Sequence, residues 1–243
     1  MLHRRTRLEF WGPVCLWLLL AVAPVWAAEP YQIDHATAEP SASLPKAVVD
    51  GLNPQGWMLY TESNGLKEPI CEVFLAKTVA GQNAAASGNL QYGTFKEGAL
   101  LGVVHLLPEA TDDYSADSHN QKLTPGYYTM RYGLLPAGTY EHGIKMGEFV
   151  ILTPVSLDHD PARIPKPDEL KRDSASGSNL DMPVTMELVA PDASSKQIPN
   201  VTMDDAGTGT FQARVPLTVG QGDTKDLRLA IRMLTPVPHD DGS

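Results

Sequence analysis

The segment between Asp113 and His119 carries an oxygen- or nitrogen-bearing side chain at every second position. Asp113, Ser115, Asp117 and His119 follow one another in this way, and His142 lies beyond the next expected strand. Carboxylate and imidazole groups are the usual ligands of divalent metal ions. Asp113, Asp117, His119 and His142 are therefore the candidate metal ligands. The segment lacks the turn glycine and final glutamate of an EF-hand loop, and a solvated loop explains the same pattern and is the favoured interpretation.

A group of tyrosines follows this segment, at positions 127, 128, 132 and 140. Tyrosine combines apolar area with a polar tip, so Tyr127, Tyr128 and Tyr140 are candidates for a surface that contacts a protein or a carbohydrate. On a strand, Tyr128 and Tyr132 share one face with Met130, whereas Tyr127 points to the other face. Packing inside the fold is the favoured interpretation of these tyrosines.

The sequence contains no complete catalytic motif. Gly-x-Ser-x-Gly, His-Glu-x-x-His and Cys-x-x-Cys are all absent from it. His105 lies on an apolar strand, where a hydrogen-bonded core residue is more common than a metal ligand. A serine triad assembled from distant residues stays open, because triads are recognised by geometry and not by sequence order. The pattern indicates a non-catalytic protein, and a divalent metal is the one cofactor that these residues could bind.

The elements that must position these residues begin after a targeting segment. Residues 1–27 resemble a cleaved secretory signal, with three arginines, an apolar run from Phe10 to Val25 and a closing Val25-Trp26-Ala27. No later segment approaches the roughly 20 apolar residues of a membrane-spanning helix. We therefore expect a soluble protein in the periplasm or outside the cell, with no membrane span after cleavage.

Charge and cysteine content limit the partners further. Removing the three arginines and one glutamate of residues 1–27 leaves 16 basic and 28 acidic residues, a net charge of −12. This acidic balance argues against nucleic acid or an anionic membrane as partner, because both require clustered positive charge. Cys71 is the one cysteine after residue 27. It lies on a predicted strand, where a buried structural thiol is favoured over a reactive one.

From residue 56 onward, short apolar runs alternate with Gly, Pro, Asn and Asp, which is typical of strands and turns. Alternating apolar and polar positions at 211–217 and 227–234 indicate sheets with one buried face. Pro167 opens a predicted short helix at about 167–174. The predicted strands cover residues 57–62, 71–79, 90–95, 99–107, 127–135, 149–153, 182–189, 211–217 and 227–234. This pattern predicts an all-β fold, specifically a β-sandwich of immunoglobulin-, transthyretin- or jelly-roll-like type with one short helix.

The chain divides by composition. Residues 28–45 are rich in Ala, Ser and Pro and are expected to form an extended lead-in. Residues 46–235 are expected to form the sandwich domain, with 160–181 either separating two halves or crossing between sheets. Residues 236–243 are expected to be a disordered tail.

Several stretches together resemble a known group of proteins. Leu123-Thr-Pro-Gly-Tyr-Tyr-Thr-Met-Arg-Tyr132 is similar to the first strand of secreted bacterial sandwiches, including transthyretin-like regulatory domains. Phe149–Pro154, Asp160-Pro161, Pro167–Leu170 and Ala175–Asn179, in this order and spacing, resemble a family of uncharacterised exported bacterial proteins, over roughly Trp57 to Pro191. The resemblance implies a β-rich exported domain and no activity. Family members carry a first histidine in an Asn-His-Met/Leu-Gly stretch, where this chain has Tyr140-Glu141-His142-Gly143. They carry a second in Asn-His-Pro, where this chain has Asn179-Leu-Asp-Met-Pro183, so the second family histidine is missing.

The function expected from the sequence is an exported, non-catalytic β-domain. It would bind a protein or carbohydrate ligand in the cell envelope, or act as an accessory to a larger assembly. The alternative is a metal-binding or metal-dependent protein that uses His119, His142 and the acidic loop 108–126. A hydrolase with a dispersed triad is the third hypothesis.

Overall fold

The computed structural model describes residues 31–36, 40, 43–63, 66–83, 90–108, 114–115, 117, 123–134, 147–177, 182–220 and 222–236. The helices of this part are α1 (Lys46–Gly51) and α2 (Pro167–Gly177). The strands are β1 (Tyr31–His35), β2 (Trp57–Ser63), β3 (Leu66–Leu75), β4 (Val79–Ala80), β5 (Leu100–Leu106), β6 (Tyr114–Ser115), β7 (Gly126–Leu134), β8 (Glu148–Pro154), β9 (Val184–Leu188), β10 (Asn200–Met203), β11 (Gly209–Val219) and β12 (Asp223–Pro236).

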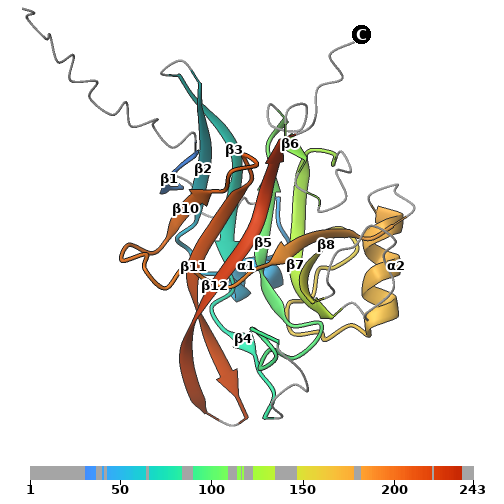
Figure 1. The fold of residues 1–243 in the computed structure, drawn as a ribbon. Helices are drawn as coiled ribbons and strands as arrows, with labels where there is room; N and C mark the ends of the chain where they lie inside the picture. The colour runs from blue at the N-terminus through green and yellow to red at the C-terminus, as the bar shows by residue number, and fades with distance from the viewer. Residues whose placement is uncertain are drawn as a thin grey trace, which may run out of the picture.

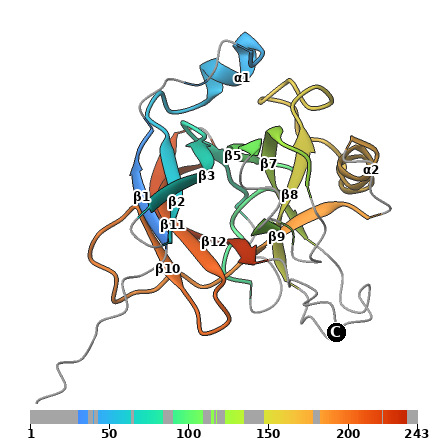
Figure 2. The same cartoon turned by 90° about the horizontal axis from the view of Figure 1, so that it is seen from above.

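The main strands form one antiparallel sheet in the order β1-β2-β3-β5-β7-β8-β9-β12-β11-β10. Seen from above, the strands run around a ring with both helices outside it (Figure 2). The first and last strands of this order, β1 and β10, lie against each other. Beside them, the Tyr31 hydroxyl donates a hydrogen bond to the Gly207 carbonyl at 2.8 Å. The sheet is therefore nearly closed into a barrel. The mostly-β class is confirmed, but the two-sheet sandwich is not specifically shown.

The core lies inside this ring and is built from alternating side chains. Phe211, Ala213, Val215 and Leu217 of β11 are buried, while Arg214 between them is exposed. The predicted inward faces of β9 and β12 are confirmed in the same way, because each contributes alternate residues to the main core cluster. Cys71 on β3 is fully buried, as the sequence predicted.

The segment 90–95 is not the short strand that the sequence predicted. It forms turns, and its one ladder contact is an isolated bridge between Phe95 and Gly81. Its aromatic side chains are instead buried in the main core cluster, where the Phe95 ring packs edge-on against Tyr132 at 5.4 Å between centroids. The Tyr92 hydroxyl donates to the Val189 carbonyl at 2.8 Å. The prediction was wrong because these aromatic residues fill the core from a turn, and local sequence cannot reveal this.

Glu148 anchors this segment from the start of β8. Its carboxylate is buried and accepts hydrogen bonds from the backbone N–H groups of Gln91 and Tyr92, both at 2.6 Å. It also accepts one from the Tyr132 hydroxyl at 2.8 Å. A buried carboxylate requires such partners, since leaving it without them costs several kcal/mol. Glu148 thereby fixes the 90–95 segment across the sheet.

The predicted helix at 167–174 is confirmed, and it continues to Gly177, so no basic residue lies in its last turn. It covers β8 on the outside of the sheet (Figure 1). Ser174 fixes it there, because its hydroxyl donates to the Leu152 carbonyl and accepts from the Val184 N–H. No helix in the described ranges is long and apolar enough to cross a membrane.

Several short elements were not predicted. Residues 31–35 lie in the segment expected to be an extended lead-in, yet they pair with β2 as β1. Helix α1 and strands β6 and β10 were also missed. Each of these elements is six residues or shorter, and a hydrophobic period cannot be detected over so few positions.

Candidate functional site

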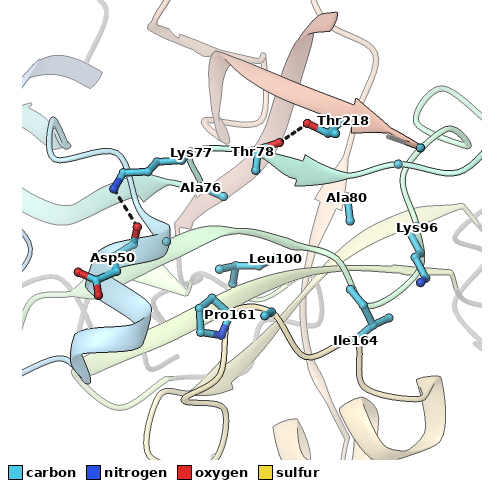
Figure 3. A pocket seen from close by; sticks show the side chains of 14 residues that line it. Asp50, Ala76, Lys77, Thr78, Ala80, Lys96, Leu100, Pro161, Ile164 and Thr218 are labelled. Carbon is cyan, nitrogen blue, oxygen red and sulfur yellow. Dashed lines mark hydrogen bonds between the residues drawn. The ribbon is translucent and has the colours of Figure 1, made fainter. Parts of the chain in front are cut away.

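The main functional candidate is a cleft of about 590 Å³ on the outside of the sheet. Helix α1, strand β4, the start of β5 and the segment 161–164 surround it (Figure 3). Its walls are predominantly apolar and include Ala76, Ala80, Leu100, Pro161 and Ile164. Clefts of about 300–1,000 Å³ with mostly apolar walls and a few polar groups are typical small-molecule sites.

Helix α1 forms one side of the cleft because its apolar residues bury against the outer face of the sheet. Val48 and Leu52 are each 1% exposed and pack with Phe74 and Val103 in a second core cluster. On the solvent side, Lys46 binds both carboxylate oxygens of Asp50 at 2.7 Å, one helical turn apart. The helix therefore has a fixed apolar face and a solvated polar face.

A glycine allows helix α1 to lie close to the segment 161–164. A Cβ atom on Gly51 would lie 3.2 Å from the Pro161 Cβ, which is tighter than an ordinary van der Waals contact. Gly51 therefore sets the width of the cleft between α1 and the segment 161–164.

The segment 161–164 is held in place by a buried ion pair. Arg131 on β7 is fully buried, and its Nε and Nη2 bind the Asp158 carboxylate at 2.5 and 2.9 Å. The remaining guanidinium N–H groups donate to the carbonyls of Gly98, Asp160 and Arg163, each at 2.8 Å. All five donors of the guanidinium are thus used. Because two of these carbonyls bracket residues 161 and 162, Arg131 positions this wall of the cleft.

Strand β4 forms the opposite wall and pairs in parallel with β11. The hydroxyls of Thr78 and Thr218 share a hydrogen bond of 2.6 Å between the two strands. The Gly81 N–H donates to the Thr218 carbonyl at 2.8 Å and continues this pairing. The β4 wall is thus tied to the sheet by backbone and side-chain bonds.

The cleft carries few charged groups. They are Asp50 and Lys77 at one end and Lys96 at the other, on either side of Leu100 (Figure 3). The Lys77 ammonium donates to the Asp50 backbone carbonyl at 2.8 Å. With apolar walls and two ammonium groups, the cleft can hold a molecule by contact and by charge. The part of its lining that the structure describes includes no histidine, cysteine or serine.

Most of the metal ligands predicted from the sequence lie outside the described residues, namely Asp113, His119 and His142. Asp117 is described, and it is fully buried. Its carboxylate accepts a hydrogen bond from the Thr185 N–H at 2.8 Å, which attaches this residue to β9. Within the described ranges, no three His, Cys, Asp or Glu side chains gather in a way that could hold a metal ion. The metal site therefore stays a prediction.

Of the tyrosines predicted to form a ligand surface, Tyr140 lies outside the described residues. Tyr128 is buried, and its hydroxyl donates to the Thr124 carbonyl at 2.9 Å. Tyr127 is partly exposed on the opposite face, as the alternation predicted. The Tyr127 ring stacks on His105 at 3.9 Å between centroids. Of Tyr127 and Tyr128, only Tyr127 is therefore accessible to a partner.

His105 is held by two partners on the outer face of the sheet. Its Nδ1 lies 2.9 Å from a Glu72 carboxylate oxygen, and its ring lies against Tyr127. The hydrogen bond expected of this histidine is present, but the residue is not part of the core as the sequence suggested. It is partly buried, because its outward position on β5 is only partly covered.

The sequence did not reveal the cleft. Lys77 and Lys96 lie in segments without a motif, and Pro161 belongs to an Asp-Pro pair, which is common in turns. The runs Lys77-Thr78 and Ala80-Gly81 contain a lysine and small residues beside an apolar strand, which is a common composition for a surface turn. No feature of the sequence identifies them as a site.

Comparisons with known proteins found no relative: no family model, no curated protein and no solved structure matches this chain. The chemistry of the site must therefore be inferred from its own residues.

Proposed function

We propose that this chain is an exported, non-catalytic β-domain of the cell envelope that binds a small, mostly apolar molecule in the cleft beside α1. One observation carries the proposal: a cleft of about 590 Å³ has apolar walls that the fold holds in place on both sides. Export is part of the proposal and is supported by the arginine-rich start and apolar run of residues 1–27.

The fixed walls favour binding without large rearrangement. Arg131 bonds hold the segment 161–164, and the Thr78–Thr218 bond ties β4 to β11. A preorganised cleft loses little conformational entropy when a ligand enters it. Burial of the ligand's apolar surface against Leu100, Ala80 and Ile164 would contribute about 25 cal/mol of binding free energy for each Å² removed from water.

The neutral fluorescent probe N-phenyl-1-naphthylamine tests the proposal, because its emission rises when it leaves water. The protein without residues 1–27 should take up the probe at one saturable site. Ala162 lines the cleft and is exposed, so Ala162→Trp should fill the cleft and weaken uptake at least about tenfold, without loss of folding.

The matched control introduces a tryptophan at an exposed position outside the cleft. Ala193 is exposed and does not line the cleft, so Ala193→Trp should leave probe uptake unchanged. Equal uptake by the Ala162→Trp protein would remove the cleft as the ligand site.

A further inference from the structure

The charged groups of the cleft are not balanced. Asp50 is the one carboxylate among the described residues of its lining, and Lys46 already binds both oxygens of that carboxylate at 2.7 Å. Lys77 contacts Asp50 only through the backbone carbonyl, at 2.8 Å. Among the described residues, the Lys77 ammonium therefore has a hydrogen-bond acceptor but no carboxylate partner, although the whole chain has a net charge of −10.

Lys96 is the second cation of the cleft. Its backbone N–H donates to the Ala80 carbonyl at 2.9 Å, which fixes its position beside β4. The carboxylate of the next residue, Glu97, accepts a hydrogen bond from the Leu134 N–H at 3.2 Å. No ion pair joins Lys96 to any residue that the structure describes. Its side chain is exposed and is available to a ligand.

The two ammonium groups lie toward opposite ends of an apolar floor. Figure 3 shows Lys77 beside Asp50, Lys96 beside Ile164, and Leu100 between them. A molecule lying on Leu100 would thus meet apolar contact along its length and a positive charge at the Lys96 end. A cationic ligand would meet two ammonium groups and no free carboxylate in this lining, so the charge pattern disfavours it.

We propose that the ligand of this cleft is an amphipathic anion. Its aliphatic or aromatic body lies on Leu100, Ala80 and Ile164, and its acidic group binds the Lys96 ammonium. This inference rests on the proposed function, because it identifies the class of molecule that the same cleft binds. A charge-assisted bond from an ammonium orients the acid, while the apolar body supplies most of the contact area.

Two probes of equal chain length isolate the charge. Octanoate and 1-octanol should each displace N-phenyl-1-naphthylamine from the protein without residues 1–27, and octanoate should bind about fivefold more tightly, as expected for one exposed charge pair. The Lys96→Gln protein should bind octanoate and 1-octanol with about equal affinity, because only the affinity for octanoate falls. Raising the salt concentration should reduce the advantage in the unaltered protein.

Lys196→Gln is the matched control, since Lys196 is an exposed lysine outside the cleft lining. It should keep the full preference for octanoate. Equal affinity for the two probes, or an unchanged preference in Lys96→Gln, would overturn the inference while the proposed function stands.

Direct titration calorimetry with octanoate separates the remaining outcomes. If the naphthylamine probe does not bind but octanoate binds in a Lys96-dependent manner, the inference holds and the neutral probe was unsuitable. If neither molecule binds, both the inference and the proposed function are wrong. The thermal unfolding midpoint of each variant is measured beside its affinity, so that loss of binding can be told from loss of folding.

Discussion

Replacing Arg131 by methionine should destabilise the protein and loosen one wall of the cleft. Arg131 is fully buried, and its five N–H groups bind the Asp158 carboxylate and the carbonyls of Gly98, Asp160 and Arg163. Arg131→Met removes all these donors at once. The substitution is close in size, so its effect reports on charge and hydrogen bonding more than on volume.

The expected magnitude follows from what remains after the change. The Asp158 side chain is 5% exposed and would keep one hydrogen bond, from the Thr129 hydroxyl at 2.6 Å. Breaking a buried ion pair by removing one partner costs about 3–5 kcal/mol. We expect the free energy of unfolding to fall by about 4 kcal/mol, against a typical total of about 5–15 kcal/mol. Removing both charges in Arg131→Met/Asp158→Leu should cost less than the single change, because no buried charge is left without a partner.

Urea unfolding of the protein without residues 1–27 measures this effect. Trp57 is the one tryptophan in that part of the chain and reports unfolding by its fluorescence. Arg232→Met is the control, because the ion pair of Arg232 with Glu187 is 39% and 36% exposed and should contribute at most about 1 kcal/mol. Affinity for N-phenyl-1-naphthylamine should also fall in Arg131→Met and not in Arg232→Met.

Two results would refute this reasoning. The first is an Arg131→Met protein no less stable than Arg232→Met. The second is a double variant that is less stable than Arg131→Met alone, since this would show that the unpaired Asp158 carboxylate is not the source of the loss.

Three further predictions concern the interior of the fold. Burial raises the pKa of Cys71 to about 12, so the native thiol should not react with dithionitrobenzoate at pH 8 and should react fully after unfolding in guanidinium; rapid native reaction would contradict this. Burial and a neighbouring carboxylate raise the pKa of Tyr132, so the folded state keeps the phenol protonated. The contribution of this phenol to stability is complete below the unfolded pKa of about 10 and is lost as pH rises above it. Urea midpoints between pH 9 and 11 should therefore fall less steeply in Tyr132→Phe than in the unaltered protein. Gly98 has φ of +85° and a Cβ there would lie 2.8 Å from the Pro165 carbonyl, so Gly98→Ala should lower the free energy of unfolding by about 1–3 kcal/mol. Gly220→Ala, with φ of +66° and open space around it, should cost less, and equal losses would exclude the close contact as a cause.

The strands that pack the core were predictable because their pattern is local. Alternation at 211–217 and 227–234 placed Phe211, Val215 and Ile231 inside, and the structure confirms each of them. The apolar run at 99–107 was predicted to be a strand, and it forms β5 between β3 and β7. Pro167 with acidic residues after it located the start of α2.

The candidate site was not predictable in this way. Polar residues in loops attracted attention first, yet three of the four predicted metal ligands lie outside the described residues. Asp117, the fourth, holds β9 through the Thr185 N–H. The cleft residues Lys77, Lys96 and Pro161 occupy ordinary turns, and none of them belongs to a spacing pattern.

By itself the sequence determined that this is a mostly-β protein, because the burial of strand residues is encoded in a period of two positions. It also favoured a buried thiol at Cys71, because free cysteine is among the most buried residue types. Only the tertiary structure decided that the strands continue around a nearly closed ring and that Tyr92 and Phe95 fill its interior. Only the structure brought Lys77, Lys96, Pro161 and Thr218 around one cleft. Such juxtapositions join segments far apart in the chain through long-range pairing and buried bonds, and no local periodicity records them.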